Sequence, residues 1–353
     1  VRPDDLLAAV DQGLLRKTGV PAAEIEDLIV GCAMPEGEQG LNIARLAGLI
    51  AGLPERVAGA TVNRFCGSSM QAIHMAAGAI ALGAGEAFIC AGIESMSRIP
   101  MGGFNPLPNP KLAAATQAYI SMGETAENLA RKYKIGRERQ EKLAVDSHAR
   151  AAAAEAAGRL AEEIVPITAG NERVEKDGCI RPGTDLKVLA ELKPAFDERG
   201  TVTAGTSSPL TDGAAATLVV SEDYAKAHGL RALARLKSIA VAGCAPEIMG
   251  IGPVEATRKA LKRAGVALKD IDVIELNEAF AVQALACMDE LGIDWGRTNV
   301  DGGAIAIGHP LGATGARITG KAAAILKREG KALALSTQCI GGGQGIATIL
   351  EAA

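Results

Sequence analysis

Two stretches of the sequence share one pattern, Gly19-Val20-Pro21-Ala22-Ala23-Glu24-Ile25-Glu26-Asp27-Leu28-Ile29 and Gly265-Val266-Ala267-Leu268-Lys269-Asp270-Ile271-Asp272-Val273-Ile274-Glu275. A helical pattern that ends in basic residues precedes each of them, over 4–17 and 254–263. Each helix is introduced by a proline, Pro3 or Pro253, a residue favoured in the first helical turn. Each stretch then runs into a short apolar strand. The repetition predicts a duplicated α/β unit.

Both halves continue with the same order of elements: a strand, a glycine-rich turn, an alanine-rich helix and a buried strand. Because such strands alternate with helices, the sheets should be covered by helices on both faces. The expected fold class is therefore α/β, with two duplicated halves in layers. The expected elements lie at 59–62, 66–69, 70–82 and 87–91 in the first half, and at 299–300, 302–315, 316–327 and 332–337 in the second.

A region of different character separates the two halves. It begins with a Pro/Gly/Asn-rich stretch at 99–110, continues through a helical stretch at 125–161, and ends in loops rich in Lys, Arg and Gly. An insertion of this size is typical of a lid or a ligand-binding excursion. We therefore expect a first half at 1–95, an inserted loop domain at 96–210, a return to the first half at 211–231, and a second half at 232–353.

The composition limits the classes of partner. A formal net charge of -4, with five Phe, three Tyr and one Trp in 353 residues, offers neither a basic face for phosphates nor a stacking platform for single strands. We therefore expect no nucleic-acid partner. The most apolar stretch, 69–96, is interrupted by His74 and Glu86, and it is typical of a buried helix and a buried strand, not of a membrane span.

Seven cysteines are present, and none belongs to a Cys-x-x-Cys pair. In a long, apolar chain this pattern favours reduced thiols over a disulfide or zinc framework, so we expect no metal site and a cytoplasmic location. The chain opens with Val1-Arg2-Pro3 and no initiator Met. A leading segment could precede it, which leaves an organelle matrix open as an alternative.

Cys66 lies in Asn63-Arg64-Phe65-Cys66-Gly67-Ser68-Ser69, where a strand should turn into a helix. A thiol at a helix N-terminus faces the positive end of the dipole and unpaired N–H groups, which lower its pKa. Cys66 is therefore a candidate nucleophile, with a packed core thiol as the alternative.

Of the four histidines, one stands in a context that suggests chemistry. His74 lies in the alanine-rich helix and is expected in the core, while His148 and His228 lie in charge-rich helical stretches and are expected at the surface. His309 lies between glycines in a turn that we expect to join a strand to a helix. An imidazole there could take the proton of a cysteine.

Two further polar residues follow buried strands of the second half. Cys339 precedes a glycine-rich loop that includes Gly341, so it could exchange protons with a substrate while the N–H groups of the loop bind an oxyanion. Asn277 could hold a water or donate to a carbonyl. Ligands of α/β sheets normally bind at strand ends, so these residues together indicate one site.

The sequence resembles the thiolase family along essentially its whole length. The resemblance implies a fold of two βαβαβαββ halves with a loop domain inserted in the first half, which agrees with the repeat and the insertion described above. The segments that carry the resemblance, in chain order, are 63–72, 119–130, 203–216, 277–281, 302–315 and 339–345.

The resemblance also implies a reaction, the cleavage of 3-ketoacyl-CoA in fatty-acid β-oxidation by a ping-pong mechanism. Cys66 would carry the acyl group, His309 would activate Cys66, and Cys339 would exchange protons with acetyl-CoA and CoA. One oxyanion hole would comprise His309 with a water on Asn277, and the other would comprise the N–H groups of Cys66 and Gly341. Coenzyme A would be a substrate, and no cofactor is implied.

The same resemblance implies where coenzyme A binds. Arg181 would lie near the adenine, where a planar guanidinium can stack on the ring. Ser208 would lie near the pantetheine, and Met122, Ala279 and Phe280 would line the tunnel. The alternative for Arg181 is an exposed loop residue.

The subtype and the assembly are also expectations. The stretch 64–69, the stretch 206–208 and Ser121, where biosynthetic members often have His, resemble degradative thiolases. A short loop after Arg98 favours a homodimer over a tetramer, and a hydratase–dehydrogenase partner is possible. Thiolases normally carry a further strand ahead of the position of Val1.

Three alternatives stay open. A biosynthetic acetoacetyl-CoA thiolase would use the same residues. A ketosynthase-like condensing enzyme would typically pair its cysteine with two histidines, whereas this sequence offers Asn277 and Cys339. A non-catalytic acyl-CoA-binding subunit would be expected to have lost at least one of these residues.

Overall fold

The computed structural model describes residues 1–353 and contains two four-stranded mixed sheets, which confirms the α/β prediction. The first sheet has the order β2-β1-β3-β6, in which β1 pairs in parallel with β2 and β3, and β6 is antiparallel to β3. The second has the order β7-β10-β9-β8, in which only β8 and β9 are parallel. The strands are β1 Asp27–Gly31, β2 Ala58–Val62, β3 Ala87–Ser95, β6 Asp212–Val220, β7 Arg235–Gly243, β8 Val273–Leu276, β9 Leu333–Ile340 and β10 Gln344–Glu351.

The repeat predicted from the sequence is present in the backbone. Helices α1 (Pro3–Thr18) and α9 (Gly252–Ala264) both end at a left-handed glycine, Gly19 with φ 71° and Gly265 with φ 68°. Each is followed by one 3-10 turn, η1 (Ala22–Glu24) or η5 (Leu268–Asp270), and then by β1 or β8. The predicted strand at 299–300 is wrong, because only a single bridge, Thr298 to Ile274, forms in this region.

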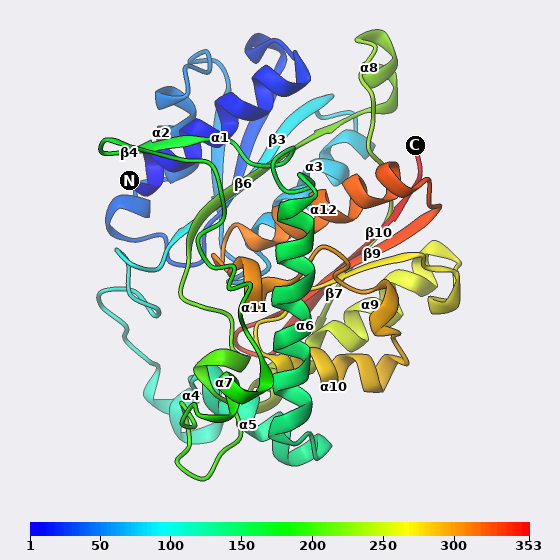
Figure 1. Ribbon diagram of the computed structural model, residues 1–353. Helices are drawn as coiled ribbons and strands as arrows, with labels where there is room; N and C mark the ends of the chain where they lie inside the picture. Colours follow the sequence, from blue (N-terminus) through cyan, green and yellow to red (C-terminus); the bar gives the residue numbers. More distant parts are fainter.

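The layers alternate between helices and sheets (Figure 1). Helices α3 (Ser68–Ala81) and α12 (Thr314–Glu329) lie side by side between the two sheets, where a side chain at Gly315 would collide with the backbone of Met70. Helices α1 and α2 (Ile43–Ile50) cover the outer face of the first sheet, and α9 covers that of the second with α10 (Ala281–Leu291) beside it. The apolar stretch 69–96 is thus a helix and a buried strand, as predicted.

The segment between β3 and β6 packs against the second half. The predicted single helical stretch at 125–161 is wrong, because Lys134 adopts a left-handed conformation with φ 53° and ends α5, and α6 ends at Ala156. Helix α6 contacts α10 and α11 (Figure 1). The elements are α4 Pro110–Ala115, α5 Met122–Tyr133, α6 Arg137–Ala156, β4 Ile167–Ala169, β5 Glu172–Val174 and α7 Leu186–Ala190. Remaining short elements are η2 Gly37–Gln39, η3 Ala204–Thr206, α8 Glu222–Ala227, η4 Pro246–Ile251, η6 Trp295–Arg297 and α11 Ala304–Ile307.

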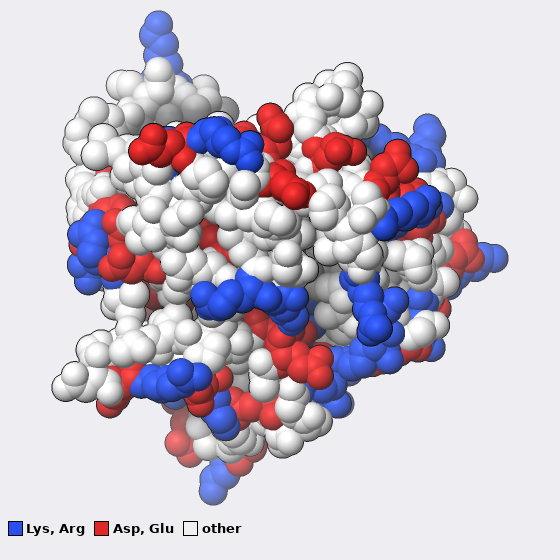
Figure 2. Space-filling view, turned by 90° about the horizontal axis from the view of Figure 1, so that it is seen from above, with Lys and Arg blue, Asp and Glu red and all other residues white.

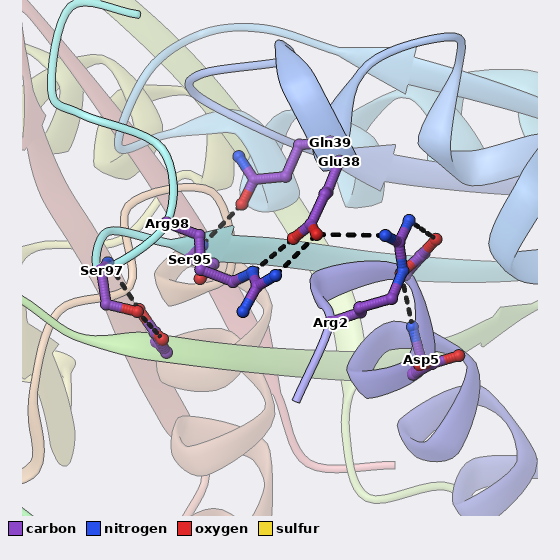
Figure 3. A network of polar contacts seen from close by, with 9 residues as sticks. Arg2, Asp5, Glu38, Gln39, Ser95, Ser97 and Arg98 are labelled. Carbon is purple, nitrogen blue, oxygen red and sulfur yellow. Dashed lines mark hydrogen bonds and ion pairs between the residues drawn. The ribbon is translucent and has the colours of Figure 1, made fainter.

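A polar network anchors the point where the chain leaves β3 (Figure 3). Glu38 accepts hydrogen bonds from Arg2, with Nη1 to Oε1 at 3.0 Å, and from Arg98, with Nη2 to Oε1 at 2.6 Å. The backbone N–H of Ser97 donates to Asp212 Oδ1 at 2.9 Å. The start of the first helix, η2, the segment after β3 and the start of β6 are therefore joined at one place.

The outside of the molecule carries both signs of charge, and Figure 2 shows basic and acidic side chains interspersed over the face it presents. None of the helices combines the length and the apolarity that a membrane crossing requires.

Candidate active site

Cys66 lies in a tight turn between β2 and α3 whose shape is fixed by side chains. Phe65, the residue before it, has φ 43°, a value that non-glycine residues rarely adopt. Asn63 Oδ1 accepts the backbone N–H of Phe65 at 2.8 Å, and Ser68 Oγ accepts that of Arg64 at 2.8 Å. Ser68 also donates to the Phe65 carbonyl at 2.6 Å. The turn therefore places Cys66 just ahead of the first turn of α3.

The sulfur of Cys66 is buried, and the residue is 6% exposed. Burial raises the pKa of the Cys66 thiol to about 11, although the backbone N–H groups of Gly341 and of Cys66 itself, directed at the sulfur, act to lower it. The lowered pKa expected from the helix N-terminus is therefore wrong, because desolvation outweighs these donors. A thiol with this pKa is protonated at neutral pH, so it needs a base to become a nucleophile.

His309 is a buried neutral imidazole. It follows α11, so the prediction of a strand-to-helix turn is wrong, although Gly308 with φ 105° does make a turn there. Burial, together with the positive charge of Arg317, lowers the pKa of His309 to about 3. Its Nδ1 lies 2.6 Å from Thr314 Oγ1, and its Nε2 lies 3.4 Å from Asn277 Nδ2. A neutral ring of this kind can accept a proton.

Asn277 follows β8 directly, as predicted. Its backbone N–H donates to the carbonyl of Thr337 at 3.0 Å, which holds the residue beside β9. The side chain is buried, and its Oδ1 has no hydrogen-bond partner, while Nδ2 faces the His309 ring. An unpaired buried carbonyl oxygen has a free acceptor for a water or a ligand donor.

Cys339 lies within β9, one residue before its end, and is fully buried. Burial raises the pKa of the Cys339 thiol well above its ordinary value, and the negative charge of a Cys66 thiolate would raise it further. The loop 341–343 then turns the chain into β10, with φ 78° at Gly342 and 87° at Gly343. The two thiols and the Gly341 N–H thus come from opposite halves of the fold to one place.

The loop that carries His309 also reaches Cys66. Leu311, two residues after His309, packs in one apolar cluster with Cys66 and Ala33. The backbone N–H of His309 donates to Thr211 Oγ1 at 3.1 Å, which anchors the loop to the segment just before β6. Cys66, Asn277, His309 and Cys339 are therefore all buried around one part of the interface between the two halves.

Of the residues expected along the tunnel, Met122 lies beside Gly341, and Ser208 and Phe280 make contacts of their own. A Cβ at Gly341 would lie 3.6 Å from the sulfur of Met122, the first residue of α5. Ser208 donates its backbone N–H and its hydroxyl to the carbonyl of Ala279, both at 3.0 Å. Phe280 meets Phe196 edge to face, with ring centroids 5.8 Å apart.

Arg181 stands apart from the four buried residues, on an exposed loop of the insertion. Its backbone N–H donates to His148 Nδ1 at 3.2 Å. The prediction that His148 is a surface residue is wrong, because it is 6% exposed and its partly buried ring supports this loop. His74 is buried as predicted, and His228 is one-third exposed. No group of three or more His, Cys, Asp or Glu side chains is placed to hold a metal ion.

Sequence reasoning missed several supporting residues. Glu94, at the end of the otherwise apolar β3, is buried and accepts the backbone N–H groups of Ala33 at 2.8 Å and Gly312 at 2.9 Å. Gln39 donates to Glu94 at 2.8 Å and accepts from Ser95 N–H at 2.6 Å (Figure 3). Glu94 could have been noticed in the sequence, because a single acidic residue within an apolar strand indicates a buried carboxylate with a specific role. Nothing in the sequence marked Thr314.

Known families match the chain over nearly all of its length. The model described as "Thiolase, N-terminal domain" matches residues 1–223, and that described as "Thiolase, C-terminal domain" matches residues 230–352. A protein of Bacillus subtilis (strain 168) named 3-ketoacyl-CoA thiolase is 48% identical over 365 aligned positions, which cover 99% of this chain and 93% of that protein.

Two solved structures give the same picture. Human mitochondrial 3-ketoacyl-CoA thiolase, also solved in complex with CoA, is similar with a TM-score of 0.92 and 40% identity over 99% of this chain and 93% of that chain. The Bacillus anthracis acetyl-CoA acetyltransferase has a TM-score of 0.91 and 39% identity over 100% of this chain and 93% of that one. The duplicated fold and these matches together show that the chain belongs to the thiolase family.

Proposed function

We propose that this thiolase cleaves 3-ketoacyl-CoA with CoA, giving acetyl-CoA and an acyl-CoA shortened by two carbons, with Cys66 carrying the acyl group between the two steps. The chain is an acyltransferase by its family, and relatives at about half identity are named 3-ketoacyl-CoA thiolase. The observation that carries the assignment of Cys66 is its burial in the turn before α3, where the backbone N–H of Gly341 is directed at its sulfur.

In the first step, His309 removes the proton of Cys66 and the thiolate attacks the 3-keto carbon. The bond between C2 and C3 then breaks, leaving the acyl group as a thioester on Cys66 and acetyl-CoA as an enolate. Negative charge develops first on the 3-keto oxygen and then on the enolate oxygen, so donors aimed at both are needed. The N–H groups of Cys66 and Gly341 provide one set, and His309 with a water held by Asn277 provides the other.

Cys339 supplies the proton that the enolate needs. Its thiol gives a proton to C2 of the departing acetyl-CoA, and the resulting thiolate later takes the proton of the incoming CoA thiol. The CoA sulfur then attacks the Cys66 thioester and releases the shortened acyl-CoA, and the Cys66 thiolate that leaves takes its proton back from His309. The pKa of Cys339, which burial raises well above its ordinary value, suits a group that gives up its proton only to a strongly basic carbanion.

We propose that the inserted segment 96–210 contributes to the binding of the substrate coenzyme A. The exposed Arg181 would stack on the adenine, and Ser208 would lie along the pantetheine. Met122, Ala279 and Phe280 would line the path to the thiols. The thiolase relative solved with CoA supports CoA as the substrate class.

The degradative direction is the preferred proposal, and the biosynthetic one is the second candidate. Ser121, where biosynthetic members often have His, and the relatives named 3-ketoacyl-CoA thiolase favour degradation of fatty acids. The acetyltransferase of Bacillus anthracis is as similar in structure, so the fold does not separate the two. A series of 3-ketoacyl-CoA substrates from four to sixteen carbons, about the range of β-oxidation, measured in the thiolytic direction, tests the proposal. Activity on the four-carbon substrate alone would favour the biosynthetic reading.

We also propose a homodimer. Strand β2 is an edge of the first sheet, and exposed apolar side chains lie on the neighbouring α2 (Leu49 and Ile50), on α3 (Met75) and directly after α3 (Leu82). A second copy of the chain would cover this face and satisfy the edge. Sedimentation over a range of concentrations tests this, because a single species of 36.1 kDa would contradict it.

The setting of the reaction is proposed on chemical grounds. All seven cysteines are free, which fits a reducing compartment such as a bacterial cytoplasm. A hydratase and a dehydrogenase that act on acyl-CoA would supply the 3-ketoacyl-CoA, and they are the partners we propose.

A further inference from the structure

Gly341 has neither a conformational nor a steric need to be glycine. The positive φ values of its loop belong to Gly342, at 78°, and to Gly343, at 87°. A Cβ added at Gly343 would lie 2.3 Å from the carbonyl oxygen of Cys244, whereas a Cβ added at Gly341 would meet no atom closer than 3.6 Å. An alanine would therefore fit the folded chain at position 341. A glycine at such a position is typical of a backbone that a ligand approaches closely.

Two side chains border the open space beside Gly341. The Met122 sulfur would lie 3.6 Å from the added Cβ, and the nearest ring atom of Phe65 would lie 3.8 Å from it. Both distances are ordinary van der Waals contacts, so the gap between Phe65 and Met122 accepts one carbon atom that touches both. Because the bordering groups are a thioether and an aromatic ring, the gap suits an apolar occupant.

The turn before α3 holds Phe65 with its side chain partly exposed. Its φ of 43° is fixed by Asn63 Oδ1, which accepts the Phe65 N–H at 2.8 Å, and by Ser68 Oγ, which donates to the Phe65 carbonyl at 2.6 Å. Phe65 is 39% exposed, although Cys66 next to it is buried. An apolar ligand that covers this ring would remove exposed aromatic surface from water.

The proposed acyl-enzyme directs its acyl chain toward this gap. The thioester oxygen would bind the N–H groups of Cys66 and Gly341, so the acyl carbon would lie against both residues. Ala33 and Leu311 pack on Cys66 in one buried cluster, which closes that side. Phe65, in contrast, is exposed, so the chain that continues from the acyl carbon has room on its side.

We propose that Phe65 is a specificity-determining residue, whose ring and the Met122 sulfur hold the first methylene groups of an unbranched acyl chain in the gap beside Gly341. The inference rests on the proposed function and names its substrate class, 3-ketoacyl-CoA with an acyl group longer than acetyl. An acetyl group ends at a single methyl, whereas each further methylene gains contact with the ring. A gap that accepts one carbon also disfavours a branch at the same position.

The test measures kcat/KM for thiolytic cleavage of the four-carbon and the eight-carbon 3-ketoacyl-CoA, and its readout is the eight-to-four ratio. We expect Phe65→Ala to lower this ratio about tenfold, the effect of one or two methylene groups losing their contact. Phe65→Leu, which keeps an apolar side chain, should lower it about threefold. Gly341→Ala keeps the backbone N–H but fills the gap with a methyl group, so it should lower the ratio by about tenfold or more.

Phe104→Ala is the matched control, because Phe104 is also an exposed phenylalanine, at 59%, and should leave the ratio unchanged. The thermal midpoint of each variant shows that it is folded, and Gly341→Ala tests the gap without altering Phe65. An unchanged ratio in Phe65→Ala or in Gly341→Ala, or equal losses at both chain lengths, would overturn the inference while the proposed function stands. An unchanged enzyme that cleaves neither substrate would overturn both.

Discussion

The side chain of Gln338 donates a hydrogen bond to the carbonyl oxygen of Cys66, across the boundary between the two halves of the chain. Gln338 precedes Cys339 on β9, so the strand that carries the second thiol also holds the backbone of the first. Gly341, two residues beyond Cys339, directs its N–H at the Cys66 sulfur. The spacing of the two thiols is therefore set by β9, and neither half could form the site alone.

Replacement of the nucleophile is the first test of this arrangement. We expect Cys66→Ser to lower acyl transfer by on the order of a thousandfold or more, because a serine hydroxyl in this buried turn is far harder to ionise than a thiol. Folding should be preserved, since the change alters one atom. Turnover and the thermal midpoint measured on one preparation check both parts. Near-normal turnover by the variant would remove Cys66 from the mechanism.

Replacement of the second thiol should separate the two chemical steps. Cys339→Ala should still form an acyl-enzyme from an acyl-CoA thioester, but it should fail to cleave 3-ketoacyl-CoA, because no group remains to protonate the enolate. Mass spectrometry of the intact protein detects the adduct. Cys287→Ala is the matched control, since it removes another fully buried thiol from the same core cluster and should keep cleavage activity. Absence of an adduct in Cys339→Ala would show that this division of roles is wrong.

Removal of the proposed adenine contact should affect binding more than chemistry. Arg181→Ala should raise the KM for CoA about fivefold with a smaller effect on kcat, as expected for loss of a stacked guanidinium worth about 1 kcal/mol. Arg173→Ala, which also truncates an exposed arginine of the insertion, should leave both constants unchanged. A loss confined to kcat would place Arg181 nearer the reacting atoms.

Two glycine substitutions distinguish a packed position from an open one. A side chain at Gly92 on β3 would collide with the carbonyl of Gly312 and with Ser69, so Gly92→Ala should lower the free energy of unfolding by about 1–3 kcal/mol. Gly78, on the solvent side of α3, meets nothing within 4 Å, and Gly78→Ala should raise it by about 0.5–1 kcal/mol. Urea unfolding measures both. A neutral effect at Gly92 would mean that the halves do not approach as closely as described.

The sequence predicted the elements that repeat and drew attention to the candidate site residues, for identifiable reasons. The pattern from Gly19 to Ile29 predicted a helix end, a turn and a strand because a glycine after a helix and a short apolar run have local causes, and its copy at 265–275 behaved the same way. Asn277 and Cys339 stood out as polar residues beside buried strands. The break at Lys134 was missed because a lysine in a left-handed conformation leaves no mark in composition.

The electrostatics of the site could not be predicted, because they depend on burial by the other half of the chain. Position at the start of α3 suggested a lowered pKa for Cys66, yet burial raises it to about 11. The position of His148 in a charged helical stretch suggested the surface, yet the segment around Arg181 folds over it. In both cases the deciding contacts come from residues distant in sequence.

His74 provides a prediction for the dependence of stability on pH. It is buried on α3, with Nε2 2.7 Å from Thr348 Oγ1 on β10, and burial, together with Arg64, lowers its pKa in the folded protein to about 3. The ordinary value for histidine in an unfolded chain is about 6.5, so between these two values the unfolded state binds the proton and the folded state does not. Stability from this residue is therefore present above pH 6.5 and is lost as the pH falls toward 3.

Replacement of His74 should reduce the slope with which the free energy of unfolding falls as the pH is lowered. The free energy of unfolding should fall by up to about 1.4 kcal/mol per pH unit for each such histidine, and His309 contributes in the same direction. His74→Gln keeps a side chain that can form a hydrogen bond with Thr348 but does not titrate in this range. The number of protons taken up on unfolding between pH 6 and pH 4, which sets the slope, should therefore decrease by about one. Urea unfolding of both proteins at half-unit steps measures the slopes, and equal slopes would mean that His74 is already protonated in the folded protein.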